Sequence, residues 1–334
     1  MKKFVHYSGK PSIGHPFETN SVLSNTILNQ ILSDETLKPA LTQFPFRVSQ
    51  HLANTLDWHD KTDPLVRQFL PDNQELENVP GYDTDPLDES SFQVADKLLH
   101  KFHGRALLLV NTNCPVHCRF CFRRHNANLL SKETGLERFD HAFDYLQKHT
   151  DIQELILSGG DPFMLPETTL IRLIEKTERI QHIKRIRIHS RVPILAPELI
   201  SDLLLKRLAQ SRLSPWIVLH VNHADELTST ARLTIKRLIL NGIPLLSQSV
   251  LLNKINDSLS ALLELFNTLI DLGIKPYYLH LLDPVHGSAH FHVDKQKGQQ
   301  LIGQLAKQLP GYAVPLLAQD IPGKQSKTVY CAIE

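Results

Sequence analysis

Three cysteines lie within eight positions of the sequence, in the run CPVHCRFCFRR that begins at Cys114. Cys114, Cys118 and Cys121 are separated by gaps of three and two residues. Thiolates at such short spacings are typical of metal sites, and an iron–sulfur cluster that only carries electrons takes four of them. Three thiolates therefore predict a [4Fe–4S] cluster with one iron left open, and an open metal position is typical of a catalytic centre.

Composition and charge set limits on what the protein is. The chain has 334 residues, of which 42% are hydrophobic, and a net charge of +1. It can bury a large core in one large domain or two smaller ones. The basic residues are scattered, so neither nucleic acid nor an anionic membrane is expected as the main partner.

The remaining cysteine and the N-terminus indicate a compartment. Cys331 is the only cysteine outside the cluster of three, so no disulfide framework is expected. No segment approaches the roughly 20 apolar residues that a membrane helix needs, and no apolar stretch follows the N-terminal lysines. We expect a cytoplasmic protein without a membrane partner.

The elements that must position these cysteines begin near Arg105. Short apolar or β-branched runs predict six strands, at 105–110, 154–158, 184–190, 216–221, 243–250 and 275–282. Amphipathic segments between them predict helices, among them 168–180, 198–210, 230–240 and 260–273. Repeated strand–helix units predict a parallel sheet in an α/β fold.

Residues 1–100 have a different texture. Helical periodicity occurs at 21–32 and 48–56, polar loops containing proline interrupt it, and no strand stands out. We therefore expect a mostly helical and connective N-terminal extension at 1–100 and a main domain at 101–334.

Chemically notable residues follow four of the predicted strands. The cysteines come after the first strand, the SGGDP segment (Ser158, Gly159, Gly160, Asp161 and Pro162) after the second, His189-Ser190-Arg191 after the third and Asp283 after the sixth. Because ligands of parallel α/β folds bind at the carboxyl ends of strands, these motifs should meet at one rim.

The cysteine loop and the SGGDP segment each have a structural alternative. The cysteines could hold a structural zinc with His117 or His125 as fourth ligand, and SGGDP could be an ordinary strand-to-helix turn. However, CxxxCxxC with Phe120 before the last cysteine resembles the radical S-adenosylmethionine (SAM) enzymes. That resemblance implies a partial (β/α)6 TIM-like barrel, a [4Fe–4S] cluster on the three cysteines, and contact of SAM with Ser158, Gly159, Gly160 and Asp161.

Further segments narrow the resemblance. CRFCFRRH, RIHSRVPI, QSVLLNKIND, YYLHLLDPVHGSAHF and GYAVPLL together resemble the lysine 2,3-aminomutase family, from about residue 81 to the end. The similarity is greatest to the short bacterial type associated with (R)-β-lysylation of elongation factor P, which carries an upstream segment like GYDTDPLDE. It implies an isomerase that converts L-α-lysine to β-lysine.

The aminomutase resemblance implies a second cofactor, pyridoxal 5′-phosphate, held by a lysine as a Schiff base. The C-terminal segment offers Lys324 and Lys327, and the residues alone do not decide between them. The family places this lysine seven positions after an acidic residue and before a threonine, as Asp320 and Lys327 stand here. The resemblance therefore points to Lys327, although KQS stands where related enzymes have glycines and Val329 where they have proline.

The same resemblance implies roles for residues around the substrate. Arg123 matches the residue that binds the α-carboxylate, and Asp283 and Asp320 match the pair that binds the ε-ammonium of lysine. Arg105 matches a residue near the pyridoxal phosphate group, and Gln248 points toward the strand ends. Aminomutases acting on glutamate would not keep two carboxylates here, so lysine is the expected substrate and an aminomutase for another amino acid is the alternative.

The resemblance also leads to expectations about the electron donor and the destination of the product. An external donor similar to flavodoxin or ferredoxin would supply electrons, and the β-lysine would pass to the enzyme that lysylates elongation factor P, or else enter lysine catabolism. The C-terminal cysteines that hold a structural zinc in longer aminomutases have no counterpart, so no zinc is expected. Both a monomer and a homo-oligomer remain compatible with the sequence.

Overall fold

A computed structural model describes residues 4–7, 31–125 and 135–333 of the chain. Its centre is a ten-stranded sheet with the order β12-β11-β10-β9-β8-β7-β6-β5-β4-β3. The six predicted strands are confirmed as β5 (Arg105–Asn111), β6 (Glu154–Gly159), β7 (Arg185–Ser190), β8 (Ser214–His220), β9 (Leu245–Val250) and β10 (Lys275–His280). They pair in parallel and in chain order.

Short strands extend this sheet at both ends. β11 (Leu316–Gln319) pairs in parallel with β10, and β12 (Thr328–Tyr330) pairs antiparallel with β11. At the other end β3 (Gln93–Ala95) and β4 (Leu98–Phe102) continue the sheet in antiparallel fashion. Because β12 and β3 are opposite ends of the strand order, the described sheet is an open partial barrel, as the family resemblance implied.

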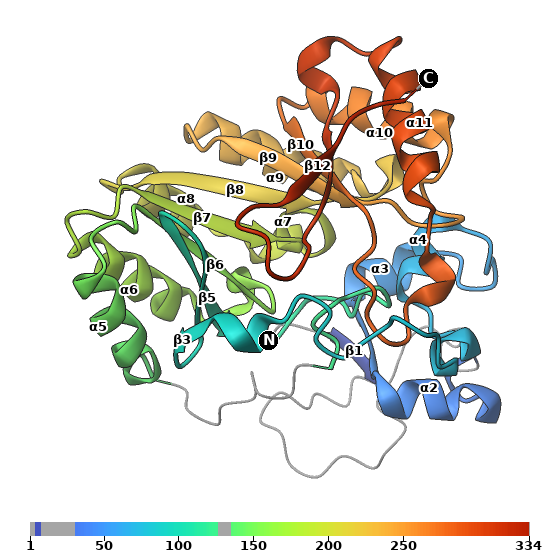
Figure 1. Cartoon of the computed structure of the whole chain (residues 1–334), viewed down its shortest axis with the longest axis horizontal. Coiled ribbons are helices and arrows are strands. Elements are labelled where there is room, and N and C mark those ends of the chain that lie inside the picture. Colours follow the sequence, from blue (N-terminus) through green and yellow to red (C-terminus); the bar gives the residue numbers. More distant parts are fainter. Residues whose placement is uncertain (1–3, 8–30, 126–134, 334) are drawn as a thin grey trace.

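Helices follow the strands and cover the outside of the sheet (Figure 1). They are α5 (Asp140–Lys148), α6 (Glu167–Glu178), α7 (Val192–Leu195), α8 (Asp202–Ala209), α9 (Ser229–Leu240), α10 (Leu259–Asp271) and α11 (Lys295–Ala306). The four helices expected among them are confirmed, and α10 ends just before Gly273, which has a φ of +77°. None of the helices in the described ranges is long and apolar enough to span a bilayer.

The N-terminal region contains helices and also strands. α2 (Lys38–Gln43), α3 (Gln50–Thr55) and α4 (Pro64–Phe69) lie there, whereas β1 (Phe4–Tyr7) and β2 (Phe46–Ser49) form a separate antiparallel pair. The expectation of no strand before residue 100 was therefore wrong, and β3 and β4 even belong to the main sheet. The periodic segment 21–32 lies almost wholly outside the described residues, and the division at residue 100 stays a prediction.

Alternation along the strands decides which side chains turn inward. In β7 Ile186 and Ile188 are buried in the apolar core, while Arg187 and His189 line the inner cavity. Successive side chains of a strand point to opposite sides of the sheet, so one strand supplies both the core and the cavity wall. The alternating sequence RIRIHS therefore places polar side chains inside the barrel while the isoleucines of β7 stay buried in the core.

Candidate active site

A cavity of about 780 Å³ lies inside the partial barrel. Its wall contains the residues that the sequence analysis assigned to the cluster, SAM, pyridoxal phosphate and lysine: Arg105, Cys114, Cys118, Cys121, Arg123, Ser158, Gly159, Gly160, Asp161, Gln248, Asp283, Asp320 and Lys327. This volume is in the range of sites for small molecules and cofactors. The expected meeting of the motifs at the strand ends is therefore observed, while the role of each residue remains to be tested.

The cysteine loop is held by backbone contacts within itself and to the N-terminal region. The N–H of Cys121 donates to the carbonyl of Cys118 (3.0 Å), and the N–H of Arg119 donates to the carbonyl of Gln68 in α4 (2.9 Å). The adjacent Arg119 and Arg124 both pair with the fully buried carboxylate of Glu75, at 2.6 and 2.5 Å. A loop without regular structure is thus fixed from both sides.

The three thiols are close enough to influence one another electrostatically. Burial, followed by the charges of Asp161 and the other two cysteines, raises the pKa of Cys114 well above its ordinary value. Burial and then the charge of Cys118 raise the pKa of Cys121 to about 11. Such thiols lose their protons when a cation binds between them, so the donor set fits an iron–sulfur cluster.

The two histidines considered as fourth ligands of a structural zinc each have a backbone partner. A ring nitrogen of His117 bonds to the carbonyl of Pro45 (2.8 Å), and one of His125 bonds to the carbonyl of His286 (2.9 Å). Both histidines thus use one ring nitrogen to bind the backbone.

The two glycines of SGGDP allow the loop after β6 to lie directly on the loop after β5. Gly159 has a φ of +105°, and a Cβ there would lie 2.7 Å from the carbonyl oxygen of Asn111. A Cβ at Gly160 would lie 2.5 Å from the carbonyl oxygen of Asn113. Only glycine permits this approach, which leaves the Gly-Gly backbone exposed to the cavity next to the cysteines.

Asp161, by contrast, turns its carboxylate toward the protein. It accepts hydrogen bonds from the hydroxyl of Ser190 (2.8 Å) and from the backbone N–H groups of Arg191 (2.7 Å) and Val192 (3.1 Å). Burial raises the pKa of Asp161 to about 6 in spite of these donors. Its side chain therefore fastens the loop after β6 to the loop after β7, and any contact of Asp161 with SAM remains a prediction.

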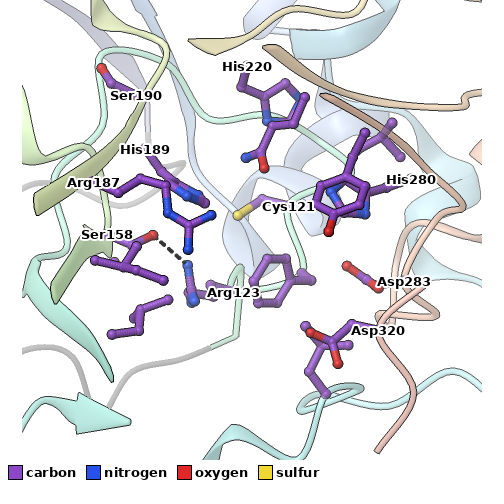
Figure 2. Close-up of a pocket in the computed structure, with 18 of the residues that line it drawn as sticks. Cys121, Arg123, Ser158, Arg187, His189, Ser190, His220, His280, Asp283 and Asp320 are labelled. Atoms are coloured by element: carbon purple, nitrogen blue, oxygen red, sulfur yellow. Dashed lines mark hydrogen bonds between the residues drawn. The ribbon is translucent and has the colours of Figure 1, made fainter. Parts of the chain in front are cut away.

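Arg123 reaches into the middle of the cavity and already has a carboxylate partner. Its Nε and one terminal nitrogen donate to the two oxygens of Glu89, at 2.8 and 2.6 Å, in the bidentate geometry that a guanidinium forms best. The other terminal nitrogen donates to Ser158 Oγ at 3.2 Å, as Figure 2 shows. Glu89 belongs to the short helix η3 (Glu89–Phe92), and sequence reasoning gave it no role.

The acidic pair lies on another side of the cavity, where Figure 2 shows Asp283 and Asp320 near each other. Asp320 accepts from Nζ of Lys101 (2.7 Å) and from Nζ of Lys327 (3.1 Å). Burial, reinforced by the nearby Asp320 and Glu89, raises the pKa of Asp283 to about 7. Lys324 is exposed and is not part of the cavity wall, which favours Lys327 of the two candidate lysines.

Arg105, Gln248 and His280 also line the cavity. Arg105 begins β5, with its guanidinium 4.9 Å from the ring centre of Phe102. Gln248 projects inward from β9, in the alternating pattern that buries Ser247 and Ser249 on the other side. Burial lowers the pKa of His280 to about 3, so this histidine is neutral and adds no charge beside the acidic pair.

Sequence reasoning gave no role to three charged wall residues that bind proposed site residues. Glu89 contacts Arg123, Lys101 contacts Asp320, and Arg191 contacts Cys118. Glu89 lies in the GYDTDPLDE segment, which had been noted only for its resemblance. Arg191 belongs to the HSR motif, whose place at a strand end was the one signal available.

Comparison with known proteins identifies the class. Residues 108–284 match the model of the radical SAM superfamily, and the chain belongs to that superfamily. The crystal structure of Streptococcus suis SuiB bound to the precursor peptide SuiA shares the fold, with a TM-score of 0.50 and 16% identity over 63% of this chain and 46% of that one.

Curated relatives identify the family within that class. The chain is 43% identical to the L-lysine 2,3-aminomutase of Escherichia coli, over 85% of this chain and 83% of the relative. It is 37% identical to that of Haemophilus influenzae, over 86% and 85%, and 32% identical to that of Clostridium subterminale, over 88% and 71%. The chain belongs to the L-lysine 2,3-aminomutase family, as the sequence motifs indicated, and this membership implies a [4Fe–4S] cluster, SAM and pyridoxal phosphate as cofactors.

Proposed function

We propose that this chain is an L-lysine 2,3-aminomutase, which moves the α-amino group of L-lysine to the β-carbon and forms β-lysine. The observation that carries this proposal is the presence of the three cysteines, Lys327 and the carboxylates of Asp283 and Asp320 around one cavity. Relatives that bear this name and align over most of their length support it.

The residues of the cavity divide into places for each cofactor. When bound, the cluster and SAM supply a radical that removes hydrogen, and pyridoxal phosphate carries the migrating nitrogen. Cys114, Cys118 and Cys121 would hold the cluster, beside the Gly159-Gly160 backbone that would contact SAM. Lys327 would bond to pyridoxal phosphate, and Arg105 would bind its phosphate.

Substrate choice follows from charge matching. Lysine brings two ammonium groups and one carboxylate, and each buried charge without a partner costs several kcal/mol. Asp283 and Asp320 would bind the ε-ammonium, while Arg123 would bind the α-carboxylate through the nitrogen that now donates to Ser158. A substrate with a side-chain carboxylate, such as glutamate, would be repelled by the acidic pair.

Asp320 has a second task in this proposal. Its contact with Lys327 holds the lysine ammonium in the cavity before pyridoxal phosphate binds. Once the Lys327 nitrogen is bonded to the cofactor, one oxygen of Asp320 becomes available to the ε-ammonium of the substrate. Asp283 completes the pair, because burial raises its pKa to about 7 and an ammonium group beside it would stabilise its ionised form.

The proposed biological setting is the cytoplasm, with a donor similar to flavodoxin or ferredoxin as the reductant. The β-lysine would be transferred to elongation factor P by the lysylating enzyme. This step is tested separately by deleting the gene, hydrolysing the purified elongation factor P and separating α-lysine from β-lysine by chromatography. Loss of β-lysine from the factor supports the step, and a factor that still carries β-lysine favours lysine catabolism.

The activity is tested by anaerobic incubation of reconstituted protein with SAM, pyridoxal phosphate, a strong reductant and L-lysine. We expect β-lysine, separated by chromatography from its isomer α-lysine before mass spectrometry, and no comparable product from glutamate or arginine. Cys121→Ser, matched with Cys331→Ser as a control outside the site, should lose cluster iron and product. Equal turnover of glutamate would contradict the proposed substrate, and a colourless protein that binds zinc would contradict the radical chemistry.

A further inference from the structure

Arg191 directs its side chain to the sulfur of a proposed cluster ligand. It follows β7 in the HSR motif, and its side chain is almost fully buried. One terminal nitrogen donates a hydrogen bond to Sγ of Cys118 at 2.9 Å. The functional proposal above gives this residue no task.

The guanidinium is fixed from behind by two buried side chains. Its other terminal nitrogen lies 2.5 Å from a carboxylate oxygen of Glu226 and 3.1 Å from Oε1 of Gln68. The second oxygen of Glu226 accepts from Gln68 Nε2 (3.1 Å) and from the backbone N–H of Asn222 (2.9 Å). Glu226 and Gln68 are essentially inaccessible to solvent, so this network holds one geometry.

The same network also holds the backbone on both sides of the contact. The carbonyl of Gln68 accepts from the N–H of Arg119, the residue directly after Cys118. The backbone N–H of Arg191 donates to Asp161 at 2.7 Å. Neither the sulfur nor the guanidinium can move away from the other without breaking these bonds.

We propose that Arg191, held by Glu226 and Gln68, is a positioning residue that acts through Cys118 to raise the reduction potential of the cluster. A hydrogen bond and a positive charge next to a ligand sulfur stabilise the reduced cluster, which carries one more negative charge than the oxidised one. Glu226 offsets part of the positive charge, but the donated N–H remains on the sulfur. The step is the entry of one electron from the external reductant, and no bond is broken. This inference rests on the proposed role of Cys118 as a cluster ligand.

The test is the midpoint potential of the reconstituted cluster, measured without SAM by dithionite titration followed by electron paramagnetic resonance. Arg191→Met removes the charge and the donor and should shift the potential to more negative values, with iron and sulfide content unchanged. Arg191→Lys keeps the charge and should shift it less, in the same direction. Arg207→Met is the matched control, because it breaks an ion pair of the same 2.5 Å length, with Glu178, far from the cluster.

The proposal can be tested both when the Arg191 variants bind a full cluster and when they do not. A potential equal to that of the parent in a fully loaded Arg191→Met or Arg191→Lys protein overturns it. If neither variant binds iron while Arg207→Met does, Arg191 only holds the loop and the tuning role fails. A lysine turnover of zero in a parent protein with a normal cluster would reject the proposed function but leave this measurement valid.

Discussion

Nζ of Lys327 lies 3.1 Å from a carboxylate oxygen of Asp320, which directly follows β11 and stands seven positions earlier in the chain. Burial alone would raise the pKa of Asp320, yet Lys327 and Lys101 hold it below its ordinary value. The carboxylate is therefore ionised at neutral pH and fixes the lysine beside the cavity. The segment between them carries Lys324 outward to solvent.

This arrangement predicts which lysine bonds to pyridoxal phosphate. Borohydride reduction of the protein incubated with pyridoxal phosphate, followed by peptide mapping, should find the cofactor on Lys327. Lys324→Ala should leave the labelling unchanged, whereas Lys327→Ala should abolish it. Label on Lys324 in the parent protein would show that the family match was assigned to the wrong residue.

The acidic pair predicts the response to lysine. Asp283→Asn should raise the KM for lysine by roughly 30-fold or more, since losing one partner of a buried charge pair costs about 2 kcal/mol or more. Asp320→Asn should do the same and should also weaken retention of Lys327. The check is steady-state kinetics with lysine, with SAM cleavage as a measure of intact cluster chemistry. Lysine use at the parental KM in both variants would refute the substrate assignment.

The raised pKa of Asp283 predicts a pH dependence. Its pKa of about 7 means that the carboxyl takes up a proton as pH falls below 7, and a protonated carboxyl does not pair with an ammonium. The KM for lysine should therefore rise by about tenfold per pH unit below this value, because only the ionised form binds. Asp283→Asn should lack this dependence. A KM that is flat between pH 5.5 and 8 would place the ε-ammonium elsewhere.

The bidentate contact between Glu89 and Arg123 predicts a positioning effect on the substrate carboxylate. Glu89→Gln should raise the KM for lysine about tenfold, because charged hydrogen bonds contribute about 1.5–3 kcal/mol. Glu178→Gln, which disrupts the equivalent pair with Arg207, is the remote control. A lower KM in Glu89→Gln would instead show that Glu89 competes with the substrate for Arg123.

The buried carboxylate of Glu75 predicts a large change in stability. Glu75→Gln leaves the guanidinium groups of Arg119 and Arg124 without a counter-charge, which should reduce the free energy of unfolding by about 3–5 kcal/mol. Urea unfolding of the cluster-free protein measures it. Asp202→Asn breaks an exposed pair with Arg237 and should have little effect. Equal losses of unfolding free energy in the two variants would contradict the claim that a buried ion pair is more important for stability than an exposed one.

The main sheet could be predicted because β5 to β10 are continuous runs of apolar or alternating residues. β3 and β12 have only three residues each, at the ends of the sheet, and their side chains are exposed or half-buried, so no hydrophobic pattern marked them. Tertiary pairing, not local preference, makes them strands.

The site divides in the same way. The cysteines and the SGGDP loop were found because they are contiguous motifs at strand ends. The partners Glu89 and Lys101 could not be found, because their contacts form only when distant segments meet; Lys101 and Asp320 are 219 residues apart in the chain. The family resemblance identified Arg123 as a site residue, but it did not identify the carboxylate of Glu89 that binds Arg123.

The contact of Lys101 with Asp320 joins β4, near one end of the open sheet, to the residue that follows β11 near the other. The wall of the barrel is thus completed by a charge pair where a closed barrel would have backbone hydrogen bonds. In the proposed reaction the other oxygen of the same carboxylate, which now accepts from Lys327, binds the substrate ammonium, so one side chain serves both the seam and the substrate. Loss of this carboxylate would therefore open the wall of the barrel as well as weaken its hold on lysine.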